Sequence, residues 1–512
     1  MTQPKITAPA DLGPETILEI AAGQPVRVAA TLLDAVGRHC AAAREVLGRG
    51  DPVYGVNTGM GALAGVRLTE AEQLAHQRNL MLARATGGPP WLDAADTRAI
   101  IAVRLRTFLS GDSGVSAQLC QRLADFLNAG VVPAVPRTGM GCAGEIMPLA
   151  HAFGPLVGIG RVLAPGGGPA SAGDVTAASD RGPAPAGGMT VPAAGALRAS
   201  GLGDFSLGPK EGIALLAGVP GATALGLRRL AEARALEPAM ETAAALSIAA
   251  ADASRDPYAA ACARGDDILA GVLGRLRAAV GDNPEPRALQ APVSFRVAGP
   301  VLTQVLRAGD ALASALGRAL TGVTDSPAFL DGRFVGTAGF HGIDLAAHCD
   351  LLTAALAHAA EVSAARLHRL LDPRVTGLPA QLAPRPGPDT GLVTVHKRAA
   401  GEIHALRRLA AATPVGLIET SGGQEDVQSF AWEAAATLRG ALRHTQAVTA
   451  CELLTAYQAC ALAERTELSG RPVPAGCRGA LDRLAEIISP IDADRPFGED
   501  IERILRAGVP CW

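Results

Sequence analysis

Tyrosine is scarce in this chain of 512 residues, which contains Tyr54, Tyr258 and Tyr457 and no others. Tyr54 lies in VYGVNTGMGALAG, a glycine-rich segment without helical periodicity. Such a loop lets the backbone approach a ligand closely and holds the phenol at the edge of a site. A phenol acts as a general acid or base when neighbouring groups lower its pKa. A tyrosine in such a loop is by itself more often structural, so the segments that follow decide between the two interpretations.

The Tyr54 loop is the first of several motifs that resemble, in the same order, those of the histidine and aromatic amino-acid ammonia-lyase and aminomutase family. Its YGVNTGMG is similar to the family signature YGxNTGFG. The resemblance covers essentially the whole chain. It implies a mainly α fold of the ammonia-lyase type with a long central helical bundle, and a homotetramer whose active sites combine residues from three subunits. The later motifs are GMGCAGEIMPLAH (139–151), GPKEGIALLAG (208–218), RDPYAAAC (255–262), GFHG (339–342) and TSGGQEDVQS (420–429).

The resemblance also implies a prosthetic group, which this chain is expected to lack. The family cyclises an Ala-Ser-Gly backbone and then removes the serine hydroxyl, which leaves an electrophilic methylidene-imidazolone. The matching triplet here is Cys142-Ala143-Gly144. Ala143 carries no leaving group on its β-carbon, and Cys142 lies one position too early to replace the serine. We therefore predict that the protein uses no cofactor.

Other departures from the family pattern show that residue 143 is not an isolated change. The family asparagines are replaced by Ala217, Ser326 and Gly339, and the glutamine before the RDPY aspartate is replaced by Arg255. A single engineered replacement of the serine would have left these positions unchanged. The selectivity histidine aligns with Arg84, and the arginine that binds the substrate carboxylate aligns with Ala261.

The retained motif residues define the candidate site. By resemblance, Tyr54 is the catalytic base, Tyr258 assists in proton transfer and Glu425 lies close to the substrate. Loss of the arginine at Ala261 would leave a substrate carboxylate unmatched in a dry site, which is unfavourable. The substrate is therefore predicted to be an ester, an amide or a carrier-bound thioester rather than a free amino acid. The predicted substrate-contacting residues are Arg84, Arg255, Asn57, Phe340, Ala143 and Ala217.

Two functions fit these patterns, and a third fits poorly. The first is an enzyme of specialised metabolism that uses tyrosine acid/base chemistry, without the prosthetic group, for elimination, conjugate addition or cyclisation on a carbonyl-activated substrate. The second is a catalytically dead relative that acts as a binding or scaffold protein, which the many polar losses favour. The third is an ordinary aromatic amino-acid ammonia-lyase, which Ala143 opposes.

Composition limits the partners and the location of the protein. Hydrophobic residues make up 48% of the chain, charged residues 19%, and the formal net charge is −3. This balance argues against nucleic acid or an anionic membrane as a partner and favours a small-molecule substrate. The nine dispersed cysteines form no CxxC pair and indicate reduced thiols rather than disulfides or a metal site. The N-terminal segment lacks a signal pattern, so a cytoplasmic location is predicted.

Alanine-rich helical periodicity dominates the chain and predicts the elements that position the motifs. Three consecutive domains are expected: residues 1–200 with the Tyr54 loop and the degenerate triplet, a helical bundle over 201–460, and a helical region over 461–512. Residues 164–187, rich in Gly, Pro and Ala, are expected to form a flexible insertion. Helices are predicted over 28–47, 71–85, 212–251, 308–320, 345–371 and from Asp426 to Leu462, and short strands over 52–56 and 161–163.

Overall fold

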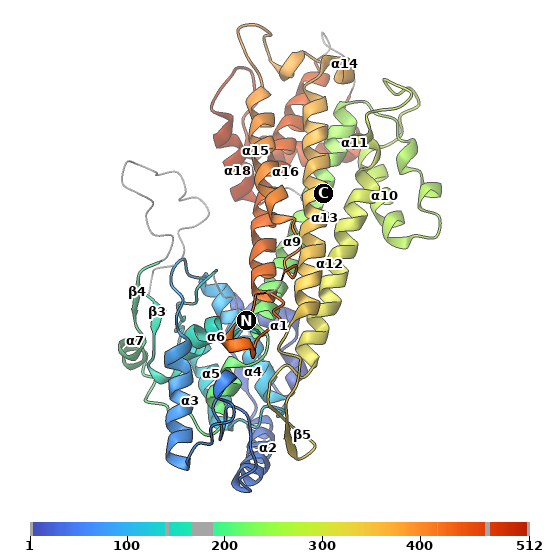
Figure 1. The fold of residues 1–512 in the computed structure, drawn as a ribbon. Helices are drawn as coiled ribbons and strands as arrows, with labels where there is room; N and C mark the ends of the chain where they lie inside the picture. Colours follow the sequence, from blue (N-terminus) through green and yellow to red (C-terminus); the bar gives the residue numbers. More distant parts are fainter. Residues whose placement is uncertain (1–3, 139–142, 165–187, 417, 466–471, 509–512) are drawn as a thin grey trace. The chain divides into compact units, whose positions relative to one another are not determined.

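Helices dominate the structure of the protein, a computed structural model that describes residues 4–138, 143–164, 188–416, 418–465 and 472–508 (Figure 1). The mainly α class predicted from the sequence is confirmed. The strands described form three two-stranded pairs: parallel β1 (Lys5–Ile6) with β2 (Arg27–Val28), and antiparallel β3 (Arg161–Leu163) with β4 (Thr190–Pro192) and β5 (Ala328–Leu330) with β6 (Arg333–Val335). The predicted insertion at 164–187 lies, apart from Ala164, outside the described residues.

Two compact units, each assembled from non-consecutive segments, make up the chain. The first unit contains Met1–Arg228, Ala313–Cys349 and Ala412–Ala436, and the second contains Arg229–Leu312, Asp350–Ala411 and Thr437–Trp512. Both units are therefore built from parts of the chain that are far apart in sequence. The three consecutive domains predicted from the sequence are a different division of the chain and stay a prediction.

The first unit is organised around α4 (Ala94–Leu109), which is buried along almost its whole length. Asp93 caps this helix by accepting a hydrogen bond from the Asp96 N–H at 2.8 Å. α4 packs against α1 and α5, while α3 packs against α6 and α8. The helices of this unit are α1 (Pro14–Ala21), α2 (Ala30–Gly48), α3 (Glu70–Arg84), α4, α5 (Ala117–Asn128), α6 (Ile146–Phe153), α7 (Ala193–Ala199) and α8 (Glu211–Leu216).

Buried arginines on α4 hold the surrounding backbone together. Arg98 donates to the carbonyl oxygens of Ile20 and Leu127, both at 2.8 Å. Arg106 donates from Nε to the Leu320 carbonyl at 2.9 Å. Because guanidinium groups present several donors in a fixed geometry, each can satisfy carbonyls from different segments at once. Part of the arginine content of this chain therefore serves the fold.

Most of the second unit is a bundle of long helices, four of which have one end in the first unit. The second unit also contains α10 (Asp267–Val280), α11 (Val293–Arg296), α14 (Pro373–Thr376), α17 (Ala475–Ile487) and α18 (Phe497–Ala507) (Figure 1). Glu452 lies at the centre of this bundle with 0% exposure. It accepts hydrogen bonds from Ser247 at 2.7 Å and from Arg366 Nε at 2.6 Å, which ties three helices together. The long helices are α9 (Pro220–Ala250), α12 (Ala298–Thr321), α13 (Ile343–Leu370), α15 (Val393–Leu409) and α16 (Ala431–Ala463).

The predicted helices are present within one to three residues at most of their ends. Two begin elsewhere, since α12 starts at Ala298 rather than at 308 and α16 starts at Ala431 rather than at Asp426. Two further predictions need correction. The stretch expected as one helix over 212–251 is divided, because Gly218 adopts a φ of +81° between α8 and α9. Residues 52–56 form no strand, and residues 54–57 form a turn. The strand expected at 161–163 is β3.

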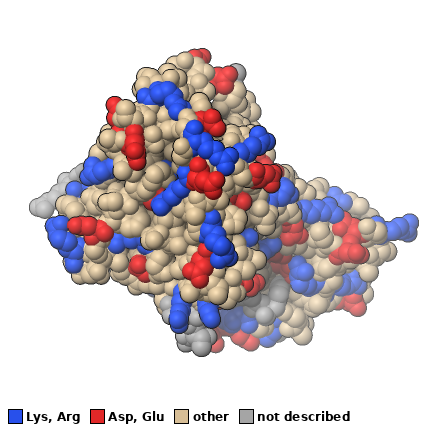
Figure 2. All heavy atoms as spheres, turned by 90° about the horizontal axis from the view of Figure 1, so that it is seen from below, with Lys and Arg blue, Asp and Glu red and all other residues tan. Residues whose placement is uncertain are grey.

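The stretch Glu211–Ala250 is long and apolar enough to cross a membrane by length and composition alone. Its most apolar window is 89% buried inside the protein, and the break at Gly218 separates α8 from α9. Both features are typical of core helices in a protein that does not span a membrane. On the face shown in Figure 2, acidic and basic side chains are interspersed, which is the surface expected for a net charge of −3.

Candidate active site

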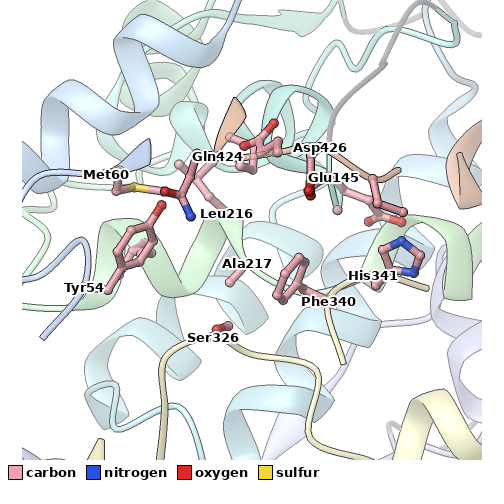
Figure 3. Close-up of a pocket in the computed structure, with 17 residues that line it drawn as sticks. Tyr54, Met60, Glu145, Leu216, Ala217, Ser326, Phe340, His341, Gln424 and Asp426 are labelled. Atoms are coloured by element: carbon pink, nitrogen blue, oxygen red, sulfur yellow. The ribbon is translucent and has the colours of Figure 1, made fainter. Parts of the chain in front are cut away.

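A pocket of about 370 Å³ lies within the first unit and collects residues from most of the family-like motifs. Figure 3 shows Tyr54 and Met60 at one end of it and Glu145 and His341 at the other. Phe340, Ala217 and Ser326 lie between these ends. The lining residues are Tyr54, Met60, Ala143, Gly144, Glu145, Ile146, Ile213, Leu216, Ala217, Gly218, Ser326, Phe340, His341, Gln424, Glu425, Asp426 and Val427.

The Tyr54 loop is held in place by Asn57, whose side chain is 4% exposed. Its Oδ1 accepts the Val53 N–H at 2.7 Å and its Nδ2 donates to the Asp51 carbonyl at 2.8 Å. These bonds close the turn that replaces the predicted strand. Asn57 was predicted to contact substrate, but its amide is used inside the loop and does not line the pocket.

Tyr54 itself stands at the pocket mouth with 39% exposure. Its phenol oxygen accepts a hydrogen bond from the Gly61 N–H at 2.8 Å. Behind the loop, the buried Gln77 donates to the Gly55 carbonyl at 3.0 Å and accepts the Ile213 N–H at 3.1 Å. Gln77 therefore joins the Tyr54 loop to α8, and the sequence analysis missed this residue. The only signal for it was a lone polar side chain on the inner face of a predicted helix.

The break between α8 and α9 supplies another wall of the pocket. Ala217 lines it, and its carbonyl accepts a hydrogen bond from Arg104, which is 0% exposed. Burial lowers the pKa of Arg104 to about 10. A side chain at Gly339 would have no room, since an added Cβ would lie 2.1 Å from the Val323 carbonyl oxygen. The family asparagine therefore cannot be accommodated at Gly339 without movement of the backbone.

Glu145 is the main lining residue that the sequence analysis did not single out. It is 1% exposed and lies before the N-terminus of α9, where its carboxylate accepts the Gly221 N–H at 2.6 Å and the Ala222 N–H at 2.5 Å. Burial raises the pKa of Glu145 to about 8, against the opposing effect of the two backbone hydrogen bonds. The signal available in the sequence was an acidic residue directly after Gly144, where the family motif has aspartate.

A raised pKa at Glu145 predicts a stability that falls with pH. Between the ordinary value of 4.5 and about 8, the folded state keeps a proton that the unfolded state has released. Stability therefore decreases as pH rises through this window, by on the order of 5 kcal/mol in total. Glu145→Gln removes the titration, so its thermal midpoint should rise relative to that of the wild type from pH 5 to pH 8.5.

The matched control for this measurement is Glu45→Gln, at a side chain that is 76% exposed. Its thermal midpoint should stay at a constant offset from the wild type over the same pH range. Glu145→Gln is also expected to lower stability at pH 5, because an amide cannot accept both backbone hydrogen bonds. A constant offset between Glu145→Gln and the wild type would contradict the raised pKa.

Glu425 and Arg84 bring opposite charges to the Tyr54 end of the pocket. Glu425 accepts a hydrogen bond from Thr420 Oγ1 at 2.8 Å, and Arg84 donates to the Met60 sulfur at 3.8 Å. Burial lowers the pKa of Arg84, and the nearby Tyr54 and Glu425 oppose that shift. Arg84 does not line the pocket, but its charge acts on two residues that do.

Tyr258 and Arg255 belong to the second unit and are not among the lining residues. Tyr258 is 2% exposed, and its hydroxyl donates to the Phe295 carbonyl. Burial raises the pKa of this phenol. Arg255 is 5% exposed and donates to the carbonyls of Ile248 and Ala253. The roles predicted for these two residues stay predictions, and Cys142 of the triplet lies outside the described residues.

Comparisons with known proteins agree with this placement of the motifs. The sequence profile described as aromatic amino acid lyase matches residues 12–484. Histidine ammonia-lyase of Geobacillus thermodenitrificans is 33% identical over 495 residues, which covers 94% of this chain and 92% of that protein. Histidine ammonia-lyase of Anaeromyxobacter dehalogenans is 31% identical over 471 residues and 89% of each chain.

Solved structures show the same fold. Tyrosine aminomutase from Streptomyces globisporus is 25% identical with a TM-score of 0.85, and covers 96% of this chain and 94% of its own. The ergothionase of Treponema denticola is 24% identical with a TM-score of 0.86, and covers 98% of each chain. With the profile and the two histidine ammonia-lyases, these likenesses establish that the chain belongs to the aromatic amino acid lyase family.

Proposed function

We propose that this protein is an enzyme of the lyase family that works without the methylidene-imidazolone group and uses Tyr54 for acid/base chemistry. The observation that carries the proposal is a formed pocket that keeps Tyr54 and Glu425 while residue 143 in its lining is alanine. The methyl group of Ala143 offers no hydroxyl to eliminate, so the residues present do not fit the family's electrophile. In this proposal, activation of the substrate comes from its own carbonyl group.

The proposed reaction is an elimination, a conjugate addition or a cyclisation, each of which moves a proton next to a carbonyl. Tyr54 removes or returns that proton, and its phenol oxygen is positioned by the hydrogen bond that it accepts from the Gly61 N–H. Glu145, with its pKa raised to about 8, is a proton donor to the developing enolate at the other end of the pocket.

The substrate is proposed to be a small molecule whose carboxyl group is masked, such as a thioester on a carrier. Apolar lining residues, among them Met60, Leu216 and Phe340, keep water from the reacting atoms. A homotetramer in the cytoplasm remains part of the proposal. In such an assembly, a role for Tyr258 and Arg255 would have to come from another copy of the chain, because neither lines the pocket of its own.

The burial of Tyr258 favours the second candidate function, a binding or scaffold protein without activity. Its hydroxyl is already bonded to the Phe295 carbonyl, so one of the two phenols expected at the site is not free. Against this candidate stands the pocket of about 370 Å³, which is neither filled nor collapsed and which Tyr54 still lines. The pocket therefore favours the enzyme over the scaffold.

A combined mass and exchange measurement tests the proposal. The intact mass of the purified protein should equal the mass calculated from its sequence, because formation of the prosthetic group would remove two water molecules. In D2O, the protein should accelerate exchange of the α-proton in an N-acetylcysteamine thioester of phenylalanine, followed by proton NMR. A mass lower by two waters would remove the first half of the proposal, and an exchange rate equal to the buffer rate would favour the scaffold.

A further inference from the structure

Gln77 carries a buried amide that bonds to two segments of the candidate active site at once. The residue lies on α3 and is 0% exposed. Its Nε2 donates to the Gly55 carbonyl at 3.0 Å, and its Oε1 accepts the Ile213 N–H at 3.1 Å. Gly55 directly follows Tyr54, and Ile213 lines the pocket. One side chain outside the lining therefore connects the segment of Tyr54 to the wall formed by α8.

Both bonds go to backbone groups at places where regular secondary structure supplies no partner. Ile213 is the third residue of α8, and the first N–H groups of a helix have no carbonyl partner within it. Gly55 is buried in a turn, where its carbonyl accepts from Gln77 and its N–H donates to Thr58 Oγ1 at 3.3 Å. Because buried backbone groups need partners, the donor and the acceptor of this amide are both required. An aliphatic side chain of the same size would supply neither.

Close packing restricts the three segments that meet at Gln77. A Cβ atom added to Gly212 of α8 would lie 2.4 Å from the Gln77 carbonyl oxygen. One added to Gly55 would lie 2.3 Å from Ile213 Cδ1. Gly55 also has a φ of +66°, a backbone conformation that favours glycine. The turn after Tyr54 therefore contacts α8 directly, α8 contacts α3, and the amide of Gln77 fixes which backbone groups face one another.

We propose that Gln77 is a positioning residue, which sets the place of the Tyr54 phenol in the pocket by holding the Gly55 carbonyl to α8. Tyr54 and Gly55 are adjacent, so a shift of Gly55 moves the backbone that carries the phenol. A second restraint on the phenol is the Gly61 N–H, which donates to its oxygen at 2.8 Å. Gln77 does not line the pocket, so it acts on the reaction through Tyr54. This inference rests on the proposed function, in which Tyr54 moves the proton.

Gln77→Met tests this role, because methionine is as long as glutamine but has neither a strong donor nor a strong acceptor. At saturating thioester it should lower the rate of α-proton exchange by about tenfold or more, since misplacement of a reacting group is costly. Binding of the thioester should change by less than about threefold, because Gln77 makes no contact with the substrate. The matched control is Gln73→Met. Gln73 lies one turn earlier on α3 and donates to the Leu68 carbonyl at 3.2 Å, so its replacement should leave the exchange rate unchanged.

Gln77→Glu distinguishes positioning from a contribution to stability alone. A protonated carboxyl group has one donor and one acceptor, as this use of the amide requires, whereas the ionised group has no donor for the Gly55 carbonyl. Burial raises the pKa of a carboxyl group, so the introduced acid is protonated at pH 5. At this pH Gln77→Glu should exchange the proton about tenfold faster than Gln77→Met, and the advantage should shrink as pH rises.

Two results of this comparison would overturn the inference. One is the absence of any advantage of Gln77→Glu over Gln77→Met at pH 5, and the other is an advantage that grows with pH. If Gln77→Met does not fold, the rate of Gln77→Glu relative to the wild type should still fall as pH rises, and a rise would count against the positioning role.

A readout without turnover separates this inference from the proposed function. The chain has three tyrosines, so 3-fluorotyrosine gives three fluorine resonances, and Tyr54→Phe identifies that of Tyr54. Gln77→Met should shift or broaden this resonance, while Gln73→Met should leave it in place. If the wild type shows no exchange but the resonance responds to Gln77→Met alone, the proposed function fails and the positioning role stands. If exchange depends on Tyr54 while Gln77→Met keeps the wild-type rate and resonance, the function stands and the inference fails.

Discussion

Replacement of Tyr54 by phenylalanine should lower the rate of α-proton exchange in the thioester probe by about 10²- to 10⁴-fold, the usual contribution of a positioned acid or base. The change removes one oxygen atom at the mouth of the pocket and leaves the ring in place. That oxygen accepts the Gly61 N–H at 2.8 Å and is close enough to Arg84 to influence its pKa. Binding of the thioester should change by less than about threefold, because the ring of Tyr54 stays in place.

The control for this variant is Tyr457→Phe, which removes the same atom from a buried tyrosine of the second unit. It should leave both the exchange rate and the binding unchanged. Tyr258→Phe separates the two candidate functions further. A loss of exchange in Tyr258→Phe would mean that a second copy of the chain completes the pocket. If Tyr54→Phe retains the wild-type exchange rate, Tyr54 is not the base and the proposed mechanism is wrong.

The motifs predicted where most of the lining residues lie in the sequence, and the structure brings Tyr54, Ala143, Ala217, Phe340 and Glu425 around one pocket. These residues could be predicted from the sequence because each of them belongs to a motif with a distinctive local pattern. The helices could also be predicted from the sequence, because alanine-rich periodicity extends over whole elements. Arg84 was predicted to contact substrate; it does not line the pocket and donates to the sulfur of the lining residue Met60.

Features that depend on burial, or on contacts between residues distant in sequence, could not be predicted from the sequence. Tyr258 matches a motif as well as Tyr54 does, but no local pattern shows that its hydroxyl meets the carbonyl of Phe295. Glu145 is an ordinary acid in the sequence, and only the desolvation produced by packing against α9 raises its pKa to about 8. The break at Gly218 was hidden because apolar residues continue on both sides of it, so periodicity indicated one helix where there are two.

Lys210→Met is expected to produce the largest loss of stability among single changes near the pocket. Lys210 pairs with Asp325, and both side chains are 1% exposed. Removal of the ammonium leaves Arg104 as the remaining cation that acts on the buried carboxylate of Asp325. The Oδ1 of Asp325 already has no hydrogen-bond partner among the described residues. Breaking such a pair costs about 3–5 kcal/mol, which corresponds to a decrease of the thermal midpoint on the order of 10 °C. The thermal midpoint is the suitable observable, because a chain with two compact units need not unfold in one step.

The position of this pair links stability to the pocket. Lys210 lies directly before α8, which contributes Ile213 and Leu216 to the lining, and Asp325 directly precedes the lining residue Ser326. Lys210→Met should therefore weaken binding of the thioester as well as lower the midpoint. Replacing both partners, as in Lys210→Met with Asp325→Leu, should recover part of the stability, because neither member of the pair is then left without the other. Arg49→Met breaks an exposed pair with Glu45, whose side chains are 61% and 76% exposed, and should change stability by less than about 1 kcal/mol. If Lys210→Met lowers stability as little as Arg49→Met does, the Lys210–Asp325 pair does not hold α8 in place.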